Sequence, residues 1–137
     1  VVFEAALGSA KNYESTGAYM KAFGLNLRET SSGTKQGRLK IAKSAAGEPR
    51  HYLYFVTLRA IQNDEVVGAW YQQKLKRDGV LALGDEKERD GRRLKAIVAV
   101  MRKLARALWH VARGQRFDSR KLFDCRKLGL PPAALAA

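Results

Sequence analysis

The chain has 137 residues, of which 26 are lysine or arginine and 13 are aspartate or glutamate, so its formal net charge is +13. This length suits one domain of ~100–200 residues, and a hydrophobic content of 46% is typical of a folded protein. We expect one domain over residues 1–127 and a flexible Pro- and Ala-containing tail over residues 128–137. One cysteine and two histidines exclude an internal disulfide and a zinc finger, and no apolar segment is predicted to cross a membrane.

The positive charge is concentrated in two blocks. Residues 35–59 carry six basic side chains and one acidic one, and residues 92–137 carry twelve basic and two acidic side chains. Residues 60–91 between them are weakly acidic, with five basic and seven acidic side chains. Basic surfaces attract phosphate groups because they release condensed counterions, so this distribution indicates a nucleic-acid partner.

The first predicted helix covers residues 13–23, where aromatic and apolar side chains recur at helical spacing and Gly24 follows as a stop signal. Residues 25–47 lose this periodicity and combine Ser, Thr and Gly with several basic side chains. They are predicted to form a long basic loop, with a short extended piece at residues 39–42. Loops of more than ~12–15 residues are commonly functional or disordered.

Two further helices are predicted in the middle of the chain. Residues 50–62 have apolar side chains around most of the helix, which predicts a central, buried element. A third helix is predicted from Asn63 or Asp64, either of which can cap it, to about Arg77. The Gly- and charge-rich segment 83–90 is predicted to be a surface loop.

The clearest predicted helix begins at Asp90 or Gly91 and ends near Arg113, because apolar residues recur there every three or four positions. A last short turn is predicted over residues 117–122. The expected fold is mainly α: a compact domain of four to five helices, with a long basic Ser/Gly loop between the first two.

One side of the long predicted helix is basic. Its aligned residues are Lys95, Arg102, Arg106 and Arg113, and further basic residues follow at Arg116, Arg120, Lys121, Arg126 and Lys127. A solvated helix face is the usual explanation of such charges, but residues 92–137 contain only two acidic partners. This imbalance favours contact with a nucleic-acid backbone.

Two other groups of residues were weighed for catalysis. The acidic side chains at positions 64–90 fall at predicted helix caps and in a loop, so no metal site is expected within this chain. The loop Thr30–Thr34 places hydroxyl side chains beside Gly33, with cationic residues following. A serine attacking a phosphodiester needs such surroundings, but Ser-Ser-Gly-Thr is also an ordinary loop composition.

Taken together, several stretches resemble one family. They are GLNLRETSSG (24–33), KQGRLKIAK (35–43), RHYLYFVTLRAIQ (50–62), VVGAWYQQKLKRDG (66–79) and AIVAVMRKLARALWHVARGQRFDSRKLFD (96–124). In this order the chain resembles the C-terminal transposase domain, also called transposase domain twenty, of insertion-sequence elements of family one hundred and ten, which move by a bridge-RNA-guided recombinase.

The resemblance implies a catalytic serine in the Ser-Gly pair after the first helix, which places it at Ser32, with Ser31 as the less favoured neighbour. Ser32 is expected to attack a DNA phosphodiester and form a covalent phosphoserine. From charge and proximity we assign DNA contacts to basic residues of the loop, the following helix and the long helix. They are Lys35, Arg38, Lys40, Lys43, Arg50, Arg102, Arg106 and Arg113. The long gap between Lys43 and Gly47, and the loop 84–91, depart from the family pattern.

The resemblance also implies partners outside this segment. These are a guide (bridge) RNA, other copies of the protein, and an N-terminal RuvC-like domain whose carboxylates bind Mg²⁺. Because the chain starts without methionine, we expect a fragment that is inactive alone, from a cytoplasmic protein that is nucleoid-associated when it acts. The alternative function is a non-catalytic, basic helical module that binds DNA or RNA.

Overall fold

The computed structural model describes residues 2–25, 27–29, 39–41 and 47–130. Its elements in chain order are α1 (Val2–Leu7), η1 (Ala10–Asn12), α2 (Thr16–Ala22), β1 (Leu27–Glu29), β2 (Leu39–Ile41), α3 (Gly47–Asn63), α4 (Glu65–Arg77), η2 (Val80–Ala82), α5 (Glu86–Val111), α6 (Ser119–Leu122) and η3 (Cys125–Lys127), where η marks a 3-10 helix. The prediction of a mainly α domain is confirmed. No helix among the described residues is long and apolar enough to span a bilayer.

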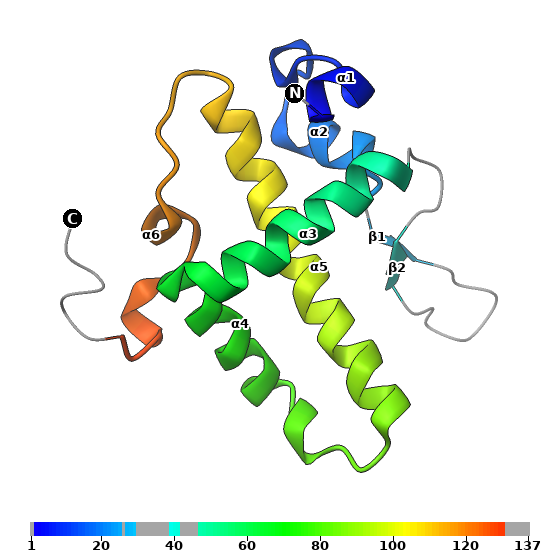
Figure 1. The fold of residues 1–137 in the computed structure, drawn as a ribbon, viewed down its shortest axis with the longest axis vertical. Coiled ribbons are helices and arrows are strands. Elements are labelled where there is room, and N and C mark those ends of the chain that lie inside the picture. The colour runs from blue at the N-terminus through cyan, green and yellow to red at the C-terminus, as the bar shows by residue number, and fades with distance from the viewer. Residues whose placement is uncertain (1, 26, 30–38, 42–46, 131–137) are drawn as a thin grey trace.

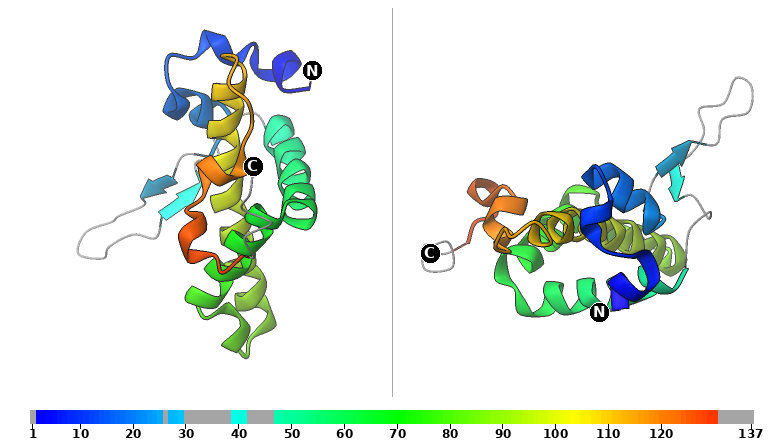
Figure 2. Two further views of the ribbon diagram at one scale, coloured as in Figure 1. Left: turned by 90° about the vertical axis from the view of Figure 1, so that its left-hand side faces the viewer. Right: turned by 90° about the horizontal axis from the view of Figure 1, so that it is seen from above.

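Helix α5 is the axis of the fold. Figure 1 shows α3 crossing α5 and α4 running beside its first half, and Figure 2 shows α2 and α3 on different sides of α5. The core forms where these helices meet, and Phe23, Leu53, Val67 and Val100 in it are fully buried. Burial of apolar surface from α2, α3 and α4 against α5 therefore stabilises the domain.

Helix α5 begins earlier than its apolar pattern predicts. Asp85 caps it by accepting a hydrogen bond from the Lys87 N–H at 3.1 Å, so most of the segment 83–90 is helix and the surface-loop prediction is wrong there. The physical reason is the cap, together with acidic side chains in the first turn that suit the positive end of the helix dipole. The predicted C-terminus is two residues late, since α5 ends at Val111.

Helix α3 is only half covered, which corrects the prediction that it is central and buried. Leu53 and Thr57 are buried, and the Thr57 hydroxyl donates to the Leu53 carbonyl at 2.8 Å. Tyr52, Phe55 and Val56 are 44%, 51% and 47% exposed. Because α4 and α5 cover one side of α3 only, the apolar residues on its other side face outward.

Other local predictions agree with the structure. Asp64 caps α4 through hydrogen bonds from the N–H groups of Val66 and Val67, at 2.9 and 3.2 Å. Helix α2 lies within the predicted residues 13–23, whereas α1 was not predicted. Gly68 fits closely against the end of α3, since a Cβ at this position would lie 2.7 Å from the Ile61 carbonyl oxygen.

The extended piece predicted at residues 39–42 is present as β2. It pairs with β1 in an antiparallel hairpin in which Leu27 lies opposite Ile41 and Glu29 opposite Leu39. Residues 30–38 join these two strands and lie outside the described part of the chain. At the C-terminus, Leu128 and Leu130 pack against the core, and the rest of the predicted tail, residues 131–137, is not described.

Candidate nucleic-acid interface

A pocket of about 280 Å³ lies between the C-terminal half of α5 and the chain that returns beside it. The lining residues that matter for its chemistry are Lys103, Arg106, His110, Arg116, Phe117 and Lys121. Figure 1 shows the returning segment turning back along α5 before it forms α6.

The reversal after α5 follows from local backbone chemistry. Gly114 has φ of +86°, a left-handed conformation that glycine adopts without steric cost. The N–H groups of Arg113 and Gln115 both donate to the His110 carbonyl, at 3.0 and 3.2 Å. These bonds end the helix and direct residues 115–118 back along α5, so Phe117 and Lys121 come to face Arg106 across the pocket.

Lys103 holds the other wall of the pocket in place. Its ammonium donates to the Leu122 carbonyl at 3.1 Å and lies 5.2 Å from the centre of the Phe123 ring and 5.5 Å from that of Trp70. Partial burial lowers the pKa of Lys103 below its ordinary value, and the positive charge of Arg106 lowers it further. Lys103 therefore anchors α6 and adds positive potential to the pocket.

Most of this positive charge is not neutralised within the described chain. Of the described acidic side chains, Asp118 alone lines the pocket, and the Nε of Arg120 donates to it at 2.9 Å. The hydrogen bond from Arg120 holds the pKa of Asp118 below its usual value, so it stays ionised and bound to Arg120. Among the described residues, no acidic side chain forms an ion pair with Lys103, Arg106, Arg116 or Lys121. The pocket can therefore bind an anion.

The structure places the basic residues predicted for one side of the long helix in different surroundings. Arg106 is exposed at the pocket and Arg102 lies one turn before it, partly buried. Arg113 lies beyond the end of α5 and turns to the N-terminal segment, where its guanidinium donates to the carbonyl oxygens of Ala10 and Tyr13 at 3.2 and 2.7 Å. Its Cζ also lies 3.5 Å from the centre of the Trp109 ring. Arg113 thus has a structural role, and its contact with DNA stays a prediction.

The other predicted site residues lie elsewhere or outside the described chain. Arg50 is in the first turn of α3, partly buried, and Lys40 is in β2, where its backbone pairs opposite Arg28. The predicted positions outside the described residues are Ser32, Lys35, Arg38 and Lys43. Figure 1 and the right-hand view of Figure 2 place the hairpin and α6 on opposite sides of α5. Lys40 in the hairpin therefore lies away from the basic residues near α6.

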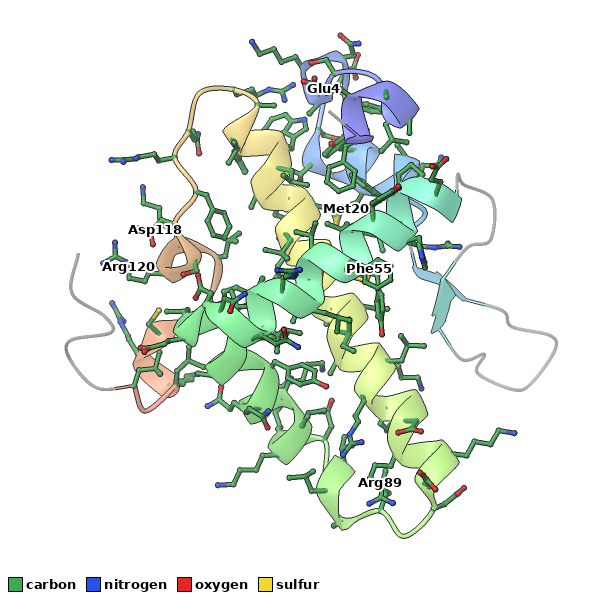
Figure 3. The ribbon with its side chains drawn as sticks, viewed as in Figure 1. Glu4, Met20, Phe55, Arg89, Asp118 and Arg120 are labelled. Carbon is green, nitrogen blue, oxygen red and sulfur yellow. The ribbon has the colours of Figure 1, made fainter. Side chains whose placement is uncertain are left out.

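The sequence does not predict the pocket, although it identifies Arg116 and Lys121 as basic. Figure 3 shows Asp118 and Arg120 side by side at α6, away from the hairpin. The signal that could have indicated the pocket is Gly114, which follows the helix and permits the chain to fold back.

The acidic residues do not form a magnesium site within the described chain. No group of three or more His, Cys, Asp or Glu side chains converges there. Asp64, Asp85, Asp118 and Asp124 each cap a helix by accepting backbone N–H bonds. These residues do not fit Mg²⁺, and none of the chemistry proposed below passes through a metal.

Comparison with known proteins identifies the family. The sequence model described as Transposase IS116/IS110/IS902 family matches residues 1–72, which is more than half of the chain, so the chain belongs to this family. Membership gives the chain a role in DNA transposition and implies interaction with DNA. No curated protein and no solved structure matches the chain. The family match covers the connection that contains Ser32, whereas the pocket at residues 103–122 follows the matched region.

Proposed function

We propose that this chain is the DNA-binding and strand-cleaving serine domain of a transposase. Ser32 attacks a DNA phosphodiester, and the basic C-terminal half of α5 binds the nucleic-acid backbone. The observation that carries the proposal is the family match over residues 1–72, which includes the Ser32-Gly33 pair. The cationic pocket between α5 and α6 supports the DNA-binding part.

The proposed reaction exchanges one phosphoester bond for another. The Ser32 oxygen forms a bond to phosphorus, the bond from phosphorus to one deoxyribose oxygen breaks, and the proton lost by the serine is balanced by the proton gained by the released hydroxyl. Because the bond energy is kept in the phosphoserine link, a strand exchange can reverse the step without an energy source. Nearby cations stabilise the charge that develops on the phosphate oxygens, which is the role proposed for Lys35, Arg38, Lys43 and Arg50.

The test of catalysis compares two adjacent serines. The protein that contains this chain is supplied with its element DNA and guide RNA, and recombination by Ser32→Ala is compared with that by Ser31→Ala. We expect Ser32→Ala to abolish recombination and the covalent protein–DNA product, and Ser31→Ala to retain both. If only Ser31→Ala loses recombination, the nucleophile is Ser31 and not Ser32. Full activity of both variants would contradict catalysis and leave the alternative, a non-catalytic module that binds DNA or RNA.

The proposal includes a guide RNA and further copies of the protein as partners, because the family resemblance implies both. The positions of the hairpin and α6 on opposite sides of α5 support an assembly. The DNA is proposed to be cleaved near the hairpin, whereas a strand is bound in the pocket. Several copies of the protein can bring these two pieces of nucleic acid together more easily than one copy can. Light scattering of the protein with and without guide RNA and DNA tests this part. We expect the mass of the complex to correspond to more than one protein copy.

A further inference from the structure

We propose that the pocket between α5 and α6 binds an unpaired nucleotide of a single-stranded nucleic acid. Its phosphate is bound by Arg106, Arg116 and Lys121, and its base lies against Phe117. This inference rests on the proposed nucleic-acid binding but goes beyond it, because a basic helix face alone would bind duplex and single strand by the same phosphate contacts.

The size of the pocket favours a single nucleotide. Its volume of about 280 Å³ is at the lower end of the ~300–1,000 Å³ that small-molecule sites occupy. An unpaired base can leave its strand and lie in a space of this size, whereas a paired base is held against its partner in the duplex.

The lining has the two kinds of surface that a nucleotide needs. Arg106, Arg116 and Lys121 are exposed cations, and among the described residues none of them forms an ion pair with an acidic side chain. Phe117 is 49% exposed and Val111 is 40% exposed, which leaves apolar surface open beside the cations. Exposed aromatic rings beside a basic groove are the surfaces on which unpaired bases stack. A simple anion would use the cations and leave Phe117 without a role.

Hydrogen bonds hold the segments around the pocket in place. Lys103 fixes α6 to α5 through the Leu122 carbonyl, and the Gln73 side chain donates to the Lys127 carbonyl just beyond α6. Asp118 caps α6 by accepting from the Arg120 N–H at 3.0 Å. Contacts that hold both walls reduce the ordering cost of binding a flexible strand.

The test compares the binding of single-stranded and duplex nucleic acid by variants of exposed residues. Fluorescence anisotropy at fixed low salt is measured with a labelled DNA single strand, an RNA single strand of the same sequence and a DNA hairpin duplex. The variants are Phe117→Ala, Phe117→Trp, Arg106→Ala and, as a control, Leu81→Ala, a 64% exposed apolar residue in η2.

We expect Phe117→Ala to weaken single-strand binding about tenfold and to change duplex binding less than about twofold, because only an unpaired base can stack on the ring. Phe117→Trp should retain or tighten single-strand binding. Arg106→Ala should weaken the binding of both the single strands and the duplex, and Leu81→Ala should change the binding of neither. The single strand, DNA or RNA, that binds more tightly is identified as the ligand of the pocket.

Equal effects of Phe117→Ala on the binding of single strand and duplex, or no effect on either, would overturn this inference while leaving the proposed DNA binding intact. Failure of the unmodified chain to bind any of the three ligands would contradict the proposed function itself. Circular dichroism spectra confirm that each variant is folded.

Discussion

The two halves of α5 use the same residue types for different purposes. In the first half, Arg92 pairs with Glu88 and Arg93 with Asp90, each at 3.6 Å, and neither pair lies near the pocket. In the second half, Lys103 and Arg106 have no acidic partner among the described residues. The first half therefore neutralises much of its own charge, and the second half leaves its charge for a ligand.

The difference shows why the number of basic residues alone does not locate a binding surface. Exposed ion pairs contribute little to stability, typically ~0–1 kcal/mol, so the first half gains mainly solubility and helix propensity. In the second half, partial burial lowers the pKa of Lys103, and the nearby charge of Arg106 lowers it further.

The largest effect is expected from the core that both halves share. Leu53 is fully buried where α3 crosses α5, so Leu53→Ala should lower the free energy of unfolding by about 2–5 kcal/mol. The control is Leu94→Ala in the first half of α5, which is 51% exposed and should change stability by less than about 0.5 kcal/mol. Urea unfolding measures both. Similar losses in the two variants would contradict the placement of the core.

A smaller loss is expected where α5 is tied to the N-terminal segment. Arg113→Ala removes guanidinium bonds to the carbonyls of Ala10 and Tyr13 and should destabilise the fold by about 2 kcal/mol, in the range of hydrogen bonds to charged groups. Faster amide hydrogen exchange should be confined to residues 2–13. Arg116→Ala, which has no such bonds, serves as the control. Unchanged exchange in the N-terminal segment would show that Arg113 does not hold it.

The start of α5 gives a prediction of about 1 kcal/mol. Asp85→Ala removes the cap on the Lys87 N–H and should lower the free energy of unfolding by about that amount. Asp85→Asn should retain most of the stability, because asparagine caps helices about as well as aspartate. If both variants are as stable as the original chain, the helix does not begin at Glu86.

The smallest effect concerns acid stability at the pocket. Arg120 lowers the pKa of Asp118 below its ordinary 3.8, so this pair stabilises the fold above that pH and ceases to do so as the pH falls through the lowered pKa. In Arg120→Gln, NMR titration of the Asp118 carboxyl should show a pKa raised toward 3.8. A pKa that does not move would mean that another group lowers it.

Local signals in the sequence predict much of this fold, because helix caps and stops depend on neighbouring residues. Asp64 and Gly24 are examples. What depends on the rest of the chain could not be predicted in this way. The apolar residues of α3 do not reveal which side is covered, and Phe55 is exposed. The partners of Arg113 are 103 and 100 residues away, at Ala10 and Tyr13.

The candidate site also has features that the sequence predicts and features that only the folded chain shows. The sequence identifies Arg106 as part of a basic face, because charge and helical spacing are local properties. The pocket arises only when the chain folds back at Gly114 and brings Phe117 opposite α5. The role of Ser32 stays a prediction from the family resemblance, since it lies outside the described residues.

The salt dependence of DNA binding distinguishes the two halves of α5, because only the second half is proposed to bind the nucleic-acid backbone. The dissociation constant of a DNA duplex is measured across salt concentrations for the original chain, for Arg106→Ala and for Arg92→Ala, which remove the same charge from the two halves. We predict that the dissociation constant of the original chain rises steeply with salt. In a plot of its logarithm against the logarithm of the salt concentration, the slope should be smaller by about 1 for Arg106→Ala and unchanged for Arg92→Ala. Equal slopes for the two variants, or a flat response of the original chain, would contradict the claim.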